Sequence, residues 1–117
     1  MKISETHRYE IHTPTGEIAG AIYVRVYFNG KPTYIANFKI YKRFRFQGYG
    51  NKLMTKALKK YGNEILKLRY FSYDKEKLSD RNLRKFYEKF GFKGPENMKT
   101  LVREANNEKK NDRNKRT

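Results

Sequence analysis

The chain has 117 residues and a formal net charge of +16, with 28 lysines and arginines against 12 aspartates and glutamates. That length allows one domain with a single modest core and is too short for two. The absence of cysteine excludes disulfides, thiolate metal sites and cysteine nucleophiles. His7 and His12 have no partners at metal-ligand spacing, so we expect no metal. No apolar run approaches the length of a membrane span, which predicts a cytoplasmic protein without a membrane partner.

Three β-strands are predicted first. Residues 3–12 form a short strand that ends at the turn signal of residues 13–16. Residues 17–28 then alternate, and Asn29-Gly30 predicts a hairpin because both residues tolerate positive φ. One face of this second strand would carry Ile18, Ile22, Val24, Val26 and Phe28. In the third strand, residues 34–41, strict alternation places Tyr34, Ala36, Phe38 and Ile40 on one face and Ile35, Asn37, Lys39 and Tyr41 on the other.

Helices and strands alternate in the second half. A helix with apolar residues at helical spacing ends at Gly62, and a strand follows at residues 66–73. Ser79 is the expected N-cap of a second helix, which ends at Gly91 after the apolar stripe Leu83, Phe86, Tyr87 and Phe90. Residues 98–102 can add a last strand. The order β-β-β-α-β-α-β predicts an α+β fold in residues 1–102, with a mixed, mostly antiparallel sheet covered by two helices. Residues 103–117 would be a polar, basic tail that is disordered or forms a loose helix.

The most informative motif is RFQGYG, residues 45–50, between the third strand and the first helix. Two glycines at a helix entrance let the backbone turn tightly and approach a bulky ligand. The first N–H groups of that helix point outward with partial positive charge, which suits a phosphate or pyrophosphate. Four basic residues surround the motif: Lys42, Arg43, Arg45 and Lys52. The segment therefore predicts an anion site, although a glycine pair before a helix is often only a turn.

Together with the segment LRKFYEKFGF, residues 83–92, this motif resembles the GNAT N-acetyltransferase superfamily. The coenzyme loop of that family has the form Arg/Gln-x-x-Gly-x-Gly/Ala, which Arg45, Gly48 and Gly50 match. Its later segment reads Asn-x-x-Ala-x-x-(Leu/Phe)-Tyr-x-x-x-Gly-Phe. The matches there are Phe86, Tyr87, Gly91 and Phe92, with Asp80 at the Asn position and Leu83 at the Ala position. The family usually begins with an extra strand and two helices, which help to wall the acceptor pocket. This chain goes almost directly into the antiparallel strands, so its acceptor side should be unusually open.

The resemblance implies acetyl-coenzyme A as the co-substrate. Phe38, Lys39 and Ile40 would pair with the pantetheine arm through their backbone groups, as an additional strand does. The expected contacts of the phosphates are the RFQGYG segment, that is Arg45, Phe46, Gln47, Gly48, Tyr49 and Gly50, with Asn51 and Lys52 after it. Asp80 would contact the pantetheine as the family's Asn does, and Asn82 would share that role. For Asp80, a helix-capping role is an equal alternative.

For the chemistry, the resemblance implies direct attack of an amine on the thioester, with Tyr87 protonating the leaving thiolate. A phenol suits that role because it keeps its proton at neutral pH. Tyr87 could instead be only a core aromatic on the helix stripe. The general base is not evident, because Tyr34 stands where several members have a Glu. A water held by Tyr34, Asn37 or Ser72 could accept the proton, as could Glu10 or Glu17.

The charge bears on the acceptor. Residues 103–117 supply only +3 of the +16, so the folded part attracts anions and repels polyamines and aminoglycosides. Arg81, Arg84, Lys85 and Lys89 are expected to form a coherent outward stripe on the second helix. These features favour an N-acetyltransferase whose acceptor is a nucleic acid, RNA or DNA, or a lysine of a nucleic-acid-associated protein. The alternative is a catalytically inactive module that binds nucleic acid or an acidic protein through its basic face.

Overall fold

The structure is a computed structural model that describes residues 2–70 and 79–105. Its elements follow the expected order, with one short 3-10 helix added after the third strand. They are β1 (Ser4–His12), β2 (Ile18–Tyr27), β3 (Thr33–Ile40), η1 (Lys42–Phe44), α1 (Tyr49–Tyr61), β4 (Leu66–Arg69), α2 (Asp80–Glu88) and β5 (Thr100–Arg103). The predicted α+β class is confirmed. Within the described residues, neither helix is long and apolar enough to cross a bilayer.

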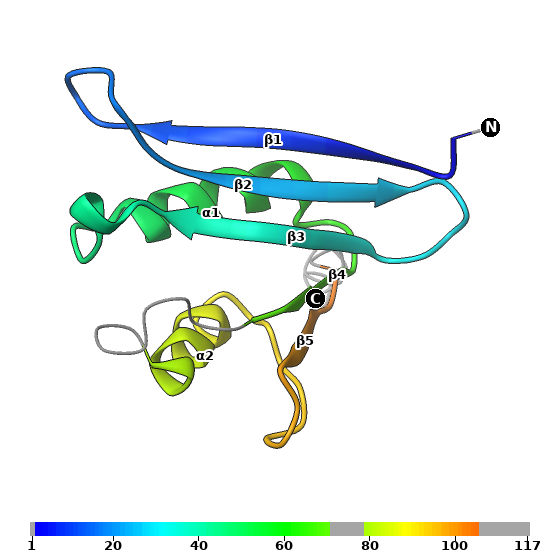
Figure 1. Ribbon diagram of the computed structural model, residues 1–117. Coiled ribbons are helices and arrows are strands. Elements are labelled where there is room, and N and C mark those ends of the chain that lie inside the picture. Colours follow the sequence, from blue (N-terminus) through cyan, green and yellow to red (C-terminus); the bar gives the residue numbers. More distant parts are fainter. Residues whose placement is uncertain (1, 71–78, 106–117) are drawn as a thin grey trace, which may run out of the picture.

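The five strands form one sheet in the order β1-β2-β3-β4-β5 (Figure 1). Every neighbouring pair is antiparallel except β3 and β4, which run parallel. This parallel pairing is short, because it joins only Thr33, Tyr34 and Ile35 to residues 66–68. Beyond Ile35 the two strands separate. Within the described chain, the β4-facing edge of β3 is therefore without a strand partner from Ala36 onward.

A bulge in β3 reverses the predicted assignment of its faces. Asn37 pairs with Tyr23, but Ile35 pairs with the very next residue of β2, so Ala36 is the extra residue. An extra residue shifts the two-residue side-chain period by one. Ile35 is therefore buried on the same side as Phe38, which packs against the core, and strict alternation was wrong along this strand. The bulge lies where β3 leaves β4, so it increases the separation of the two strands.

Both helices cover the same face of the sheet. The core on this face contains Ile22 and Val24 of β2, Leu53 and Met54 of α1, and Tyr87 of α2. In Figure 1, α1 lies behind the three long strands, and no described element lies on the face that is turned toward the reader. We call this second side of the sheet the open face.

Several predicted element ends need correction. The fourth strand ends at Arg69, and the expected remainder up to residue 73 falls partly on residues 71–78, outside the described residues. Met98 precedes β5, which begins at Thr100. Ile18 and Phe28 were expected on the same face of the second strand as Ile22 and Val24. Both are exposed, Ile18 at the start of β2 and Phe28 just after its end. The Ser79 cap is confirmed, because its Oγ accepts a hydrogen bond from the backbone N of Asn82. Gly62 is the C-cap of α1, as predicted.

The folded part extends past Val102. β5 includes Arg103, whose guanidinium donates to the carbonyl oxygens of Phe90 at 2.7 Å and Gly62 at 3.2 Å. These bonds attach the last strand to the ends of both helices, so Arg103 belongs to the domain and was wrongly assigned to the tail. The expected disorder of the tail concerns mainly residues 106–117, which lie outside the described residues.

Arg84 is not part of an outward stripe on α2. Its side chain is only 15% exposed and donates to three backbone carbonyl oxygens of the following loop, those of Gly94, Pro95 and Met98. It also pairs with Glu88 one turn later, at 3.0 Å. Arg84 therefore fastens the loop between α2 and β5, and the expected coherent stripe of four cations was wrong.

Candidate functional site

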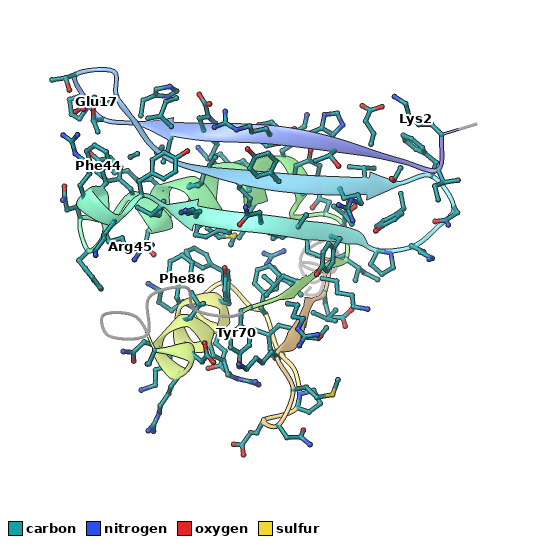
Figure 2. All side chains as sticks on the ribbon, viewed as in Figure 1. Lys2, Glu17, Phe44, Arg45, Tyr70 and Phe86 are labelled. Carbon is teal, nitrogen blue, oxygen red and sulfur yellow. The ribbon has the colours of Figure 1, made fainter. Side chains whose placement is uncertain are left out.

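A cleft of about 290 Å³ lies where β3 and β4 separate. One wall is the unpaired part of β3, and the opposite wall is the apolar side of α2, with Leu83, Phe86 and Tyr87. The glycine turn before α1 closes one end, and the end of β4 closes the other. Figure 2 shows Phe86 in the space between β3 and α2, Tyr70 beside α2 where β4 ends, and Arg45 near the end of β3. The position of the cleft thus follows from the short parallel pairing and the bulge.

The glycine turn presents the start of α1 to this cleft. Gly48 is the N-cap residue with φ of 90°, a left-handed conformation that favours glycine. A Cβ built on Gly48 would meet no atom within 4 Å, so the space beside it is open. Two residues earlier Phe46 also has positive φ, 63°, and its ring is 75% exposed at the cleft. Gln47 stabilises the turn by donating from Nε2 to the carbonyl oxygen of Arg43.

Gly50 has a different role from Gly48. It lies in the first turn of α1, and a Cβ there would be 3.4 Å from two ring carbons of Phe86 on α2. That distance is tight but could be relieved by a small shift of the ring. The second glycine of the motif therefore lets the two helices approach each other, and the first keeps space free before the helix N-terminus.

Tyr87 lies deep in the cleft. It is 5% exposed, and its ring contacts those of Phe38 on β3 and Tyr70 at the end of β4, with centroids 6.0 and 6.4 Å away. The ring thus spans the space between the separated strands. Tyr87 is also a core residue, as the alternative reading expected, but its place in the cleft wall brings its phenol close to the unpaired edge of β3.

Cations line the cleft and acids do not. Among the described residues at its surface, Lys39, Arg45, Arg69 and Lys89 are basic and none is acidic. Arg45 donates from Nε to the carbonyl oxygen of Ile40 at 3.0 Å, which anchors the turn to the end of β3. Lys89 of α2 donates to the side chain of Asn51 in α1 at 3.0 Å, so it brings a charge to the start of that helix. The sequence alone did not assign Lys89 or Arg69 to the site.

The predicted site residues divide into two groups. Those that line the cleft are Asn37, Phe38, Lys39, Ile40, Arg45, Phe46, Gly48, Gly50, Asn51 and Tyr87. Those that do not line it are Tyr34, Gln47, Tyr49, Lys52, Asp80 and Asn82. Asp80 accepts a hydrogen bond from Lys99 at 2.6 Å and stands in the first turn of α2, which agrees with its capping alternative. Tyr34 pairs with Arg25 and lies on the open face.

The two carboxylates considered as bases already have cationic partners. Glu10 forms an ion pair with Arg8 and lies near His12, and Glu17 pairs with Arg43 at 3.3 Å. Neither glutamate lines the cleft. The third candidate holder of a water, Ser72, lies outside the described residues.

Comparison with known proteins agrees with this geometry. The family model described as Acetyltransferase (GNAT) domain matches residues 6–94. No curated protein matches the sequence. An acetyltransferase from Bacillus cereus is similar in structure, with 21% identity over 85% of this chain and 71% of its own, and a TM-score of 0.58. Tetrahymena GCN5 has 16% identity over 84% of this chain and 67% of its own, with a TM-score of 0.62.

A third structure is the AtaT toxin, a mutant bound to the C-terminus of the antitoxin AtaR and to acetyl-CoA. It has 17% identity over 83% of this chain and 66% of its own, with a TM-score of 0.52. At these identities the three structures establish a shared fold, and the family model covers most of the chain. The chain therefore belongs to the GNAT family of N-acetyltransferases.

Proposed function

We propose that this cleft binds acetyl-coenzyme A and that the protein transfers the acetyl group to an amine of a nucleic acid or of a lysine in a nucleic-acid-associated protein. The proposal rests on three structural features that lie together. A free strand edge, an open helix N-terminus and a tyrosine meet in a single cleft. Each of these features fits one part of acetyl-coenzyme A.

The β3 edge fits the pantetheine arm. An exposed strand edge can bind an extended chain that carries amide groups by backbone hydrogen bonds. Residues 36–40 present such an edge, and the apolar rings of Phe38 and Phe86 line the space beside it with their centroids 5.6 Å apart. Phe38, Lys39 and Ile40 would hold the arm on this edge.

The start of α1 fits the pyrophosphate. The first N–H groups of a helix have no acceptor within the helix and carry partial positive charge. α1 has no acidic residue in its first turn, and Arg45 and Lys89 stand at the same end of the cleft. Because a Cβ on Gly48 would project into open space, its absence leaves room for a phosphate to reach the backbone. The turn also includes Gln47, and the first turn of α1 includes Tyr49 and Lys52. The side chains of these three residues do not line the cleft.

Bound acetyl-coenzyme A would supply an acetyl thioester to this cleft. Tyr87 would hold a proton on its Oη close to the reacting bond and give it to the departing sulfur, since a neutral phenol can act as a general acid. The rings around it, Phe38 and Tyr70 among them, would exclude water from this position. Tyr87 remains a proposed catalytic residue, with Asp80 and Asn82 proposed only as neighbours of the arm.

Removal of the amine proton is assigned to water. No acidic side chain of the described residues lines the cleft, but Asn37 does, and it is exposed. Its amide can orient a water molecule that accepts the proton from the attacking amine and passes it to solvent. Tyr34 lies on the same face of β3 as Asn37, so its proposed contribution is at the acceptor side of the cleft.

The acceptor follows from the charge at the cleft. Four cations and no acid among the described lining residues make approach of a polycationic amine unfavourable. An amine carried on an anionic polymer would instead be attracted. The intact cleft and the family match do not favour the alternative of an inactive binding module.

The test uses acetyl-coenzyme A labelled in the acetyl group. The protein is incubated with it and a cell lysate, which is then separated into nucleic acid, nucleic-acid-bound protein and small molecules. We expect label in one of the first two fractions, released by nuclease or by protease respectively. Tyr87→Phe should transfer label at a rate lower by ~10² or more. Label confined to small amines would contradict the proposed acceptor, and no transfer to any fraction would contradict the proposed activity.

A further inference from the structure

The open face of the sheet carries an unusual set of side chains. Tyrosines alternate with basic residues from β1 to β4, on the side opposite both helices. Cross-strand pairs define this set, since paired residues share a face: Arg8 with Tyr23, Arg25 with Tyr34, and Tyr34 with Lys67. The members are Tyr23, Tyr27 and Tyr34, with Arg8, Arg25, Lys39, Lys67 and Arg69. Tyr41, directly after β3, joins them because the Nζ of Lys39 lies over its ring.

These side chains are accessible. The tyrosines are partly exposed, and Arg8, Lys39, Lys67 and Arg69 are exposed. A small residue lies beneath part of the set, since Ala21 of β2 pairs with Lys39 on this face and is almost fully buried. Long side chains therefore lie over the strands there: Arg8 donates to the hydroxyl of Tyr23 at 2.9 Å, and the Nζ of Lys39 is 6.0 Å from the ring centre of Tyr41.

We propose that this face binds a single-stranded nucleic acid and delivers the acceptor to the cleft. Bases stack on aromatic rings whatever their sequence, and arginines and lysines attract the phosphates between them. A sheet surface that interleaves the two is the arrangement which such a strand needs. The inference rests on the proposed function, because it names the form of the anionic acceptor that the cleft would serve.

Charge decides between possible occupants of the open face. The set holds five basic residues. Glu10 of β1 lies on the same side and forms an ion pair with one of them, Arg8. Residues 106–117 carry five basic and two acidic residues, so the chain's own terminus would be repelled. A second copy with a net charge of +16 would be repelled as well. A rigid duplex exposes its phosphates but not its base faces, so the tyrosines would have no partners.

The open face is continuous with the cleft. Asn37 and Lys39 of β3 and Arg69 of β4 belong to the open face and also line the cleft. A strand that crosses the tyrosines would thus end its path beside Asn37, the residue proposed to orient the proton-accepting water. Binding on this face would place an attached amine at the acceptor side of the cleft.

The test measures binding separately from acetyl transfer. Fluorescein-labelled oligouridylate and oligothymidylate of roughly 12 nucleotides, and a duplex of equal length, are titrated with the full chain and followed by anisotropy. We expect the single strands to bind more tightly than the duplex. Tyr27→Ala and Tyr34→Ala should each weaken binding about fivefold or more, and the matched Tyr27→Phe and Tyr34→Phe should retain it, since stacking needs the ring alone. The RNA and DNA arms tell which of the two is preferred.

A charge control completes the test. The pair Arg25→Gln and Lys67→Gln should lower the slope of log affinity against log salt by about 1.4, at roughly 0.7 for each phosphate contact on a single strand. The pair Lys59→Gln and Lys60→Gln, on exposed positions of α1, removes equal charge and should leave the slope almost unchanged. Any of three results would overturn the proposal. They are equal effects of the two pairs on the salt slope, a duplex bound as tightly as a single strand, and binding of polyglutamate but of neither nucleic acid.

Acetyl-coenzyme A binding, measured by thermal shift on the same samples, separates the two proposals. If acetyl-coenzyme A raises the Tm but no oligonucleotide binds, the inference about the open face fails and the proposed function stands. If oligonucleotides bind without a shift, the proposed function fails instead.

Discussion

Gly48 offers the sharpest separation between a phosphate site and a tight turn. Gly48→Ala adds one methyl group in a left-handed conformation, which costs about 1–2 kcal/mol for a residue with a Cβ. For a domain of about 100 residues, that loss lowers Tm by roughly 4–16 °C. The added Cβ would also occupy the open space in front of α1, where the proposed phosphate must approach the backbone.

The chain contains a matched control for the strain. Gly30, in the turn between β2 and β3, has φ of 86°, and a Cβ there would also meet nothing within 4 Å. Gly30→Ala should therefore cost the same stability but lies outside the cleft lining.

The assay is thermal unfolding with and without acetyl-coenzyme A. At 100 times the dissociation constant, a ligand stabilises the native state by ~2.7 kcal/mol, and a tenfold loss of affinity reduces this to ~1.4 kcal/mol. We expect Gly48→Ala to halve the ligand-induced stabilisation or abolish it, and Gly30→Ala to keep it in full. Equal stabilisation of both variants would refute the assignment of phosphates to this turn.

Three further predictions concern the helices and the core. Tyr87→Phe should reduce turnover by ~10² or more with unchanged acetyl-coenzyme A affinity. The control Tyr70→Phe also keeps a ring in the cleft, and its turnover should be close to that of the wild type. Equal turnover of the two variants would leave Tyr87 a core residue only. Arg84→Ala should lower Tm clearly more than Arg81→Ala, because three loop carbonyls lose their donor; similar Tm values would deny that Arg84 fastens the loop. Burial, together with a hydrogen bond to Tyr9, raises the pKa of Tyr61 above its usual value of 10.0. The buried, protonated phenol therefore stabilises the fold below about pH 10, and this stabilisation is lost as the pH rises toward the folded-state pKa. Tyr61→Phe should flatten that alkaline loss of Tm, and an unchanged profile would assign it to other groups.

The order of elements could be predicted because each signal was local. Ser79 caps α2 through a bond to a residue three positions on, and Gly91 ends the following turn with φ of 96°. The stripe through Leu83, Phe86 and Tyr87 depends only on helical spacing, and all three side chains pack on the core. Such patterns need no knowledge of which segments are neighbours in space.

The missed features depend on distant neighbours. The bulge at Ala36 is defined by pairing with β2, and nothing in the alternation of residues 34–41 marks an extra residue. The burial of Arg84 depends on carbonyl groups of the loop that follows α2, which an amphipathic pattern treats as solvent. Lys89 reaches the site only because α2 packs close to Gly50, so its contact with Asn51 lies beyond sequence spacing.

The candidate site was predicted best where a motif fixed the backbone. Gly48 at a helix entrance and Tyr87 on the apolar stripe both line the cleft. Tyr34 was placed by its position in the family's strand, but it lies on the open face and outside the cleft lining. The bulge changes which residues after Ile35 share a face with Tyr34, and this brings Asn37 and Lys39 to its side.

The most direct test of the central claim is an amide NMR titration with coenzyme A. We expect the largest shifts at the backbone N–H groups of residues 36–40 and 48–51, on the β3 edge and at the start of α1. The hairpin at Gly30 should not respond, nor should the distal half of α1. Shifts centred elsewhere, or no saturable shift at millimolar coenzyme A, would contradict the claim that this cleft is the coenzyme site.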